Sequence, residues 1–155
     1  LEWVSAAEGQ RFAQVVTEFT GQIKKLGPSP VSGEKPSQQI LENLQAAKNA
    51  SSSSRLRVLV GRERELTEKG NVYEEKVPQK EFDMLLEDAV EAEFIRHKIR
   101  ILTKDNPFSV KDLAKAVGMK PPDVLCHIVN MRRRGMIMLD HVEGTTPFYK
   151  AIEAK

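Results

Sequence analysis

A chain of 155 residues, 40% hydrophobic and 30% charged, is long enough for one domain or two small ones. Its 24 basic and 22 acidic side chains leave a formal net charge of +2, too small a surplus to require or exclude a polyanionic partner. The single cysteine, Cys126, excludes an intrachain disulfide and any cysteine-ligated cluster built from this chain alone. No apolar run approaches the ~20 residues of a membrane helix, so we expect a soluble, cytoplasmic protein without a membrane partner.

The first 30 residues have the pattern of one strand followed by one helix. Residues 1–4 (LEWV) are predicted to form a short buried strand, and Ser5 with Glu8 fits a capping box. Gly27 and Pro28 end the helix that follows. Its apolar stripe at helical spacing consists of Phe12, Val15, Val16, Phe19 and Ile23. One strand and one helix bury little surface against each other, so we expect residues 1–30 to be the last βα unit of a larger α/β domain.

Residues 31–80 are expected to be a loop followed by a helical linker. The loop prediction rests on three prolines, a glycine and two serines within residues 28–36. A helix is predicted from Ser37, and the serines at 51–54 are predicted to interrupt it. A second helical segment covers residues 55–67, before a turn at Gly70. Its side chains predicted to face inward are Leu56, Leu59, Val60 and Leu66.

Residues 81–155 show the clearest succession of elements. An apolar stripe at helical spacing extends over about six turns, from Phe82 to Leu102, and includes Leu85 and Val90. A short helix is predicted next. Its start is marked by a capping serine, Ser109, with an aspartate three residues later, and its end by a glycine at 118.

The third helix of this region is predicted to begin at Pro121 and Pro122 and to end at Gly135. Its expected apolar face is Val124, Leu125, Ile128 and Met131. Past Gly135 the apolar period changes from 3.6 to 2, which predicts strands at 136–142 and 147–152 joined by a turn. The predicted fold is therefore mainly α with a small β-hairpin, ending in a winged helix-turn-helix over residues 81–155.

Winged helices bind DNA or dock onto proteins, and the charges here favour docking. In the predicted recognition helix (121–134), the first half exposes His127 and Asn130, and only Asn130 is a natural reader of base edges. Arg132, Arg133 and Arg134 can hold phosphates, or they can complement the negative end of the helix dipole. From residue 105 onward eight basic residues accompany six acidic ones, a weaker basic bias than groove-binding modules show. His127, Asn130 and the three arginines at 132–134 are the candidate contacts for nucleic acid or a partner protein.

No catalytic or metal site is expected in the chain. Cys126 and His127 are adjacent, so on a helix they point about 100° apart and suit no common ligand spacing. Cys126 is interpreted as a partly buried thiol, and acidic pairs such as Glu91 and Glu93 as solvated helix faces. No glycine-rich phosphate loop is present.

The N-terminal string LEWVSAAEG at residues 1–9, followed by Phe12, Ala13 and Phe19, resembles the end of the delta subunit of methyl-viologen-reducing hydrogenase. The resemblance covers residues 1–30. It implies an iron–sulfur parent protein that passes electrons between a hydrogenase or formate dehydrogenase and the flavoprotein subunit of a heterodisulfide reductase. The family's cluster ligands lie upstream of this string and none is present, so no cofactor residue is carried over.

These observations predict the C-terminal segment of an electron-transfer subunit of a hydrogenase or heterodisulfide-reductase complex. The expected partners are the flavoprotein subunit and hydrogenase or formate dehydrogenase subunits, and the winged helix is expected to serve docking or assembly. The alternative is a winged-helix DNA-binding regulator. Homodimerisation through the long helix is a third interpretation.

Overall fold

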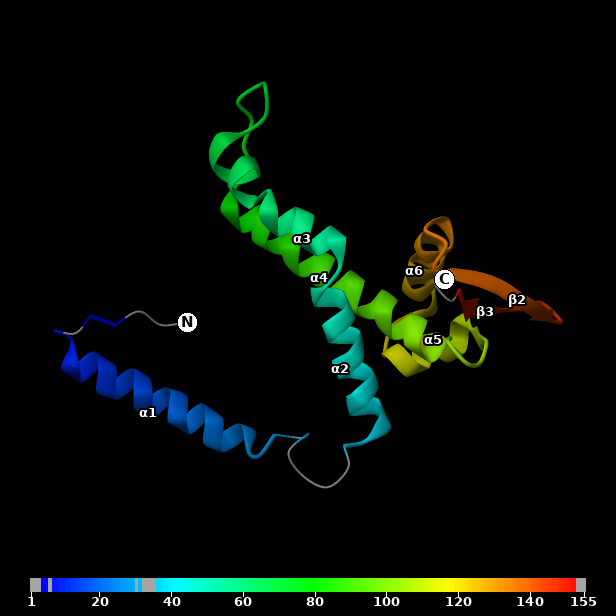
Figure 1. Cartoon of the computed structure of the whole chain (residues 1–155), viewed down its shortest axis with the longest axis horizontal. Helices are drawn as coiled ribbons and strands as arrows, with labels where there is room; N and C mark the ends of the chain where they lie inside the picture. Colours follow the sequence, from blue (N-terminus) through cyan, green and yellow to red (C-terminus); the bar gives the residue numbers. More distant parts are fainter. Residues whose placement is uncertain (1–3, 6, 30, 32–35, 153–155) are drawn as a thin grey trace. The chain divides into compact units, whose positions relative to one another are not determined.

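The computed structural model describes residues 4–5, 7–29, 31 and 36–152. Over these ranges the chain is mainly helical, with six α-helices, a π-helix (η1) and a three-stranded antiparallel sheet (Figure 1). It divides into two compact units, Leu1–Ile40 and Leu41–Lys155. The mainly α prediction is confirmed, and the sheet has one strand more than the predicted hairpin. None of the described helices is long and apolar enough to span a membrane.

Helix α1 (Gly9–Leu26) is the main element of the N-terminal unit. The predicted capping box is present in part, because Ser5 N–H donates to Glu8 Oε2 at 2.9 Å. The reciprocal bond is displaced: Ser5 Oγ accepts from Ala7 N–H at 3.4 Å, and Glu8 itself is the N-cap. Gly27 ends the helix as predicted, at a φ of 71° that favours glycine.

The apolar stripe of α1 lies on the surface of its unit. Phe12 and Phe19 are 60% and 62% exposed, and Val16 and Ile23 are exposed as well. The strand expected at residues 1–4 lies outside the described residues, except Val4, so its packing against this stripe stays a prediction. An amphipathic helix normally buries such a stripe against another element.

Helices α2 (Gln38–Ser51) and α3 (Ser54–Gly61) are separated at the predicted serine break. Ser53 caps α3, its Oγ accepting a hydrogen bond from Leu56 N–H at 3.2 Å. Leu56 is buried, but Val60 is 51% exposed, so the prediction that it faces inward was wrong. Val60 lies one turn after Leu56, about 40° further round the helix, and the covered strip of this short helix is too narrow to include it.

The chain reverses direction after the π-helix η1 (Glu65–Lys69), at the predicted turn. Gly70 has a φ of 82°, and a Cβ there would lie 2.8 Å from the backbone oxygen of Glu75. Both facts require glycine at this position. Val77 N–H then donates to Leu66 O at 2.9 Å, which closes the loop before the next helix.

Helix α4 (Gln79–Leu102) is the predicted long helix, and it packs on two sides. Its first half lies beside α3, and its second half carries Ile95 and Ile99 into the C-terminal core (Figure 1). Leu85 and Val90, assigned to a single stripe, are 49% and 46% exposed. That assignment was wrong because the two neighbours cover different faces of the helix, so the buried face changes along its length.

Helices α5 (Val110–Val117) and α6 (Pro121–Arg133) pack with the sheet around the second half of α4. The predicted cap is confirmed: Ser109 Oγ accepts from Asp112 N–H at 3.2 Å and donates to Asp112 Oδ2 at 2.6 Å. Gly118 closes α5 in the left-handed conformation. The buried core consists of Ile95, Ile99, Leu113, Ala114, Val124, Ile128, Met131, Ile137 and Tyr149.

The sheet contains β1 (Phe108–Ser109), β2 (Ile137–Glu143) and β3 (Thr146–Ala151) in the order β1-β3-β2. Strands β2 and β3 are the predicted hairpin. Strand β1 was not predicted, because two residues are too short to show a period of two. In the register, Tyr149 pairs with Phe108 on one side and Leu139 on the other, which brings the ring into the core.

Candidate functional site

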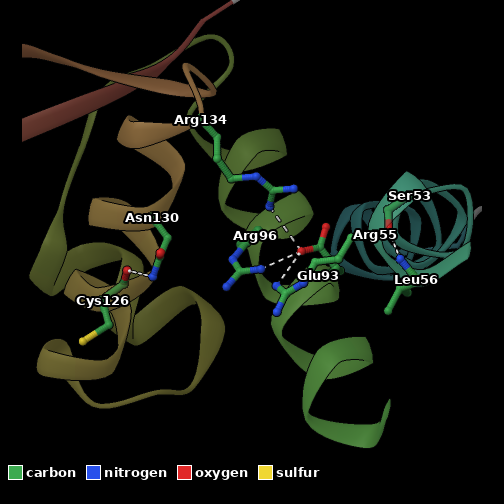
Figure 2. A network of polar contacts seen from close by, with 8 residues as sticks. All are labelled: Ser53, Arg55, Leu56, Glu93, Arg96, Cys126, Asn130 and Arg134. Atoms are coloured by element: carbon green, nitrogen blue, oxygen red, sulfur yellow. Dashed lines mark hydrogen bonds and ion pairs between the residues drawn. The ribbon is translucent and has the colours of Figure 1, made fainter. Parts of the chain in front are cut away.

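Helix α6 does not present its predicted contact residues as one surface. Asn130 is exposed, but its Nδ2 donates to the backbone oxygen of Cys126 at 2.9 Å, as Figure 2 shows. The amide is thereby turned back along its own helix, away from the position of a base-edge reader. Cys126 was expected to be partly buried and is exposed. The buried residues Val124 and Ile128 lie two positions to either side of it, so the thiol is on the opposite face of α6 and meets solvent.

His127 is half-buried beside α4. Burial lowers the pKa of His127 below its ordinary value, and the positive charge of Arg96 lowers it further, against the opposing effect of Asp123 and Glu91. Burial also lowers the pKa of His97. The imidazole of His127 is therefore neutral near pH 7 and supplies no cation for a phosphate.

Arg134 follows the last residue of α6, and its side chain reaches across to α4. Its Nη1 lies 3.3 Å from Glu93 Oε1, so one member of the predicted arginine triplet is committed to an intramolecular ion pair. Arg96, one turn along α4, donates from Nη1 to the same oxygen at 2.5 Å. Arg55 of α3 donates to it as well, at 3.3 Å (Figure 2). Three guanidinium groups, from α3, α4 and the residue that follows α6, thus converge on one carboxylate oxygen.

Glu93 is the buried centre of this arginine cluster, with a side chain 3% exposed. Burial by itself raises the pKa of Glu93. The hydrogen bond from Arg96, the charges of Arg134 and Arg96, and the hydrogen bond from Arg55 outweigh it and hold the pKa below its ordinary value. Glu93 is therefore ionised at neutral pH, and the cluster carries two positive charges in excess of its one negative charge.

A cavity of about 360 Å³ adjoins the cluster, lined by Arg55, Arg96, Asn130 and Arg134. The side chains of Arg55 and Arg134 are 47% and 43% exposed and border it on the solvent side, whereas that of Arg96 is 9% exposed. The arrangement offers guanidinium donors to an anion, with the Asn130 side chain as a polar wall. The four residues that line the cavity supply no nucleophile, and the three arginines all contact one oxygen, Oε1, of the neighbouring Glu93 carboxylate.

The interpretation of Glu93 as part of a solvated face was wrong. A signal for its burial exists in the sequence: Glu93 lies four residues after Ala89 and eleven after Phe82, on the same side of the helix as both buried residues. An acidic residue on an apolar stripe predicts a buried partner. Its partners Arg55 and Arg134, 38 and 41 residues away, carry no such signal.

The outward face of α6 combines apolar and basic side chains. Leu125 and Val129 are 44% and 41% exposed, and the expectation that Leu125 is buried was wrong. Val124 and Ile128, one before and three after Leu125, occupy the core position on this side of α6, so Leu125 lies outside it. Val129 lines a shallow cavity of about 350 Å³ with two exposed arginines, Arg132 and Arg133.

The β-hairpin carries an acidic tip. His141 Nδ1 lies 2.7 Å from Asp140 Oδ2, and its Nε2 lies 3.4 Å from Glu143 Oε1. The hydrogen bond with Asp140 raises the pKa of this exposed histidine. Its ring also stacks on Phe148, with centroids 4.8 Å apart. A tip with two carboxylates repels a phosphate backbone.

No cluster of three or more histidine, cysteine or acidic side chains suited to a metal ion occurs in the part of the chain that the structure describes. The predictions of no catalytic and no cofactor residue stay predictions.

Comparison with known proteins finds similarity over a short stretch. The chain is 61% identical over 28 residues to the iron-sulfur protein of an F420-non-reducing hydrogenase from Archaeoglobus profundus. The matched stretch is 18% of this chain and 20% of that hydrogenase protein. No protein-family model and no solved structure matches.

Proposed function

We propose that the chain is the C-terminal part of an iron–sulfur electron-transfer subunit of a hydrogenase or heterodisulfide-reductase complex in the cytoplasm. The observation that carries this proposal is the 61% identity over 28 residues to a hydrogenase iron-sulfur subunit. The described residues do not fit an iron–sulfur cluster, because they provide one exposed thiol and no group of metal ligands. In this proposal the cluster belongs to another part of the parent protein.

The apolar stripe of α1 supports an origin in a larger domain. Phe12 and Phe19 expose apolar surface that an isolated helix cannot cover. The strand predicted at residues 1–4 and the remainder of an α/β sheet would cover it. In this proposal the stripe is exposed in the present chain and buried in a longer protein that contains the rest of the α/β domain.

For the C-terminal unit we propose a winged helix that docks onto a protein. The order α4, β1, α5, α6, β2, β3 supports the winged-helix assignment, since a two-residue strand before the helix-turn-helix completes the sheet with the hairpin. The outward face of α6 supports docking: Leu125, Val129 and Arg132 are spaced by four and three residues and share one side. Apolar and arginine side chains together are typical of protein interfaces.

The test measures binding of the chain to the purified flavoprotein subunit of a heterodisulfide reductase, and to hydrogenase and formate dehydrogenase subunits, by biolayer interferometry. Val129→Asp places a charge in the proposed interface and is expected to weaken binding at least tenfold. The matched control, Ala116→Asp, introduces the same charge at an exposed position of α5 and is expected to bind normally. Equal binding by both variants would remove the α6 face from the proposal.

A second experiment measures binding of the chain to a mixed-sequence DNA duplex by fluorescence anisotropy at low and moderate salt. We expect no micromolar affinity, because the Asn130 amide is bonded to its own helix, His127 is neutral and Arg134 is paired with Glu93. Binding that falls steeply with salt and is lost on Arg132→Gln would favour the regulator instead. Light scattering on the same sample distinguishes a monomer from a dimer formed through α4.

A further inference from the structure

The cavity beside the arginine cluster has the charge and donors of an oxyanion site. Three guanidinium groups line it, and the carboxylate of Glu93, which contacts all three, offsets a single positive charge. Two positive charges therefore remain for a ligand, and one of the three arginines that supply them, Arg96, has a side chain only 9% exposed. A phosphate group near neutral pH carries a matching charge of about −2.

The donors on Arg96 show that the cluster is incomplete without a further acceptor. Arg96 uses Nη1 for Glu93, and its Nε is enclosed and has no hydrogen-bond partner among the described residues. In a planar guanidinium, Nε and Nη2 form the edge that binds carboxylates and phosphates through two parallel hydrogen bonds. A buried donor without a partner costs about 1–3 kcal/mol, so a ligand oxygen that reaches Nε or the adjacent Nη2 would stabilise the cluster.

The surrounding groups suit the same ligand. The guanidinium groups of Arg55 and Arg134 contact Glu93 through Nη1, and both side chains are nearly half exposed on the open side of the cavity. The Asn130 amide on α6 completes the lining. The volume of about 360 Å³ exceeds that of one phosphate group and leaves room for part of an attached molecule.

We propose that the cavity lined by Arg55, Arg96, Asn130 and Arg134 binds a phosphate dianion, either inorganic phosphate or the terminal group of a small phosphomonoester. The ligand bridges α3, α4 and the end of α6, three elements that Glu93 already joins. This site is independent of the hydrogenase context and of the docking face of α6.

The test is isothermal titration calorimetry of the intact chain with inorganic phosphate, adenosine monophosphate and adenosine, at constant ionic strength and pH 7.5. We expect saturable binding of about one phosphate group per chain and none of adenosine. Tighter binding of the free anion identifies a site closed around phosphate, and tighter binding of the nucleotide identifies a phosphomonoester site. Absence of saturable binding by both would overturn the proposal.

Arg134→Gln removes one half-exposed donor without touching the buried Arg96 and is expected to weaken phosphate binding about tenfold or more. Arg134→Lys keeps the charge without the planar guanidinium edge, so its phosphate affinity should lie between those of the wild type and of Arg134→Gln. Arg57→Gln, at an exposed position on the same helix as Arg55, is the control for charge alone. Equal affinity of the Arg134→Gln and Arg57→Gln proteins would place any observed binding elsewhere. Circular dichroism checks that each variant is folded.

Discussion

Neutralising Glu93 tests whether its cluster holds three helices together. In Glu93→Gln the shape is kept, but Arg96, with a side chain 9% exposed, loses its countercharge. Removing one partner of a buried ion pair costs about 3–5 kcal/mol. Arg55 and Arg134 are nearly half exposed, so each contributes only about 0.2–1 kcal/mol more. Since glutamine still accepts a hydrogen bond from Arg96, we expect the free energy of unfolding to fall by about 3 kcal/mol.

Urea denaturation followed by far-ultraviolet circular dichroism at pH 7 measures this loss. The matched control is Glu91→Gln, an exposed position two residues earlier in α4, which should change stability by no more than about 0.5 kcal/mol. A loss below about 1 kcal/mol in Glu93→Gln would refute the reasoning, because the arginines would then be satisfied by solvent.

The stability of the wild type and of Glu93→Gln should also depend differently on pH. The pKa of Glu93 is lower in the folded protein than the ordinary 4.5, so the unfolded chain binds this proton more tightly. The stability that the ionised Glu93 contributes is therefore fully present above about pH 4.5. It is lost as the pH falls through the lower pKa of the folded protein. The stability difference between wild type and Glu93→Gln should therefore be constant from pH 7 to about 5 and shrink below 4.5. A constant difference down to pH 3 would contradict the pKa assignment.

Further predictions concern single residues. In an NMR titration, His127 should titrate below pH 6.5 and His141 above it, and the opposite order would contradict the placement of both rings. Gly70→Ala should destabilise by about 1 kcal/mol or more, the size of a strained backbone position, because its φ is 82° and a Cβ meets backbone. Gly61→Ala, with open space around a helical position, should be neutral or slightly stabilising, and urea denaturation measures both variants. Ser109→Ala removes a cap and should cost about 1 kcal/mol by urea denaturation, and an unchanged midpoint would contradict the cap.

Local signals in the sequence predicted most of the C-terminal elements. The serine cap at 109, the glycines at 118 and 135 and the change of period after residue 135 each act within a few residues, so their effect is visible without the tertiary structure. Burial was harder to predict. Leu125 is apolar and at helical spacing, yet the core beside α6 is already filled. Spacing gives the angle of a side chain around its helix, whereas the width of the covered face depends on what packs there.

The arginine cluster could not be assembled from the sequence, and this changes how the triplet at the end of α6 is understood. The side chain of Arg134 lies against α4, while Arg132 and Arg133 line the outer cavity beside Val129. Three consecutive arginines therefore belong to two sites with different chemistry. A combined substitution would mix lost stability with lost binding, because Arg134 contacts the buried Glu93 and the other two lie on the outer face. Only separate substitutions can assign a binding defect to the docking face of α6.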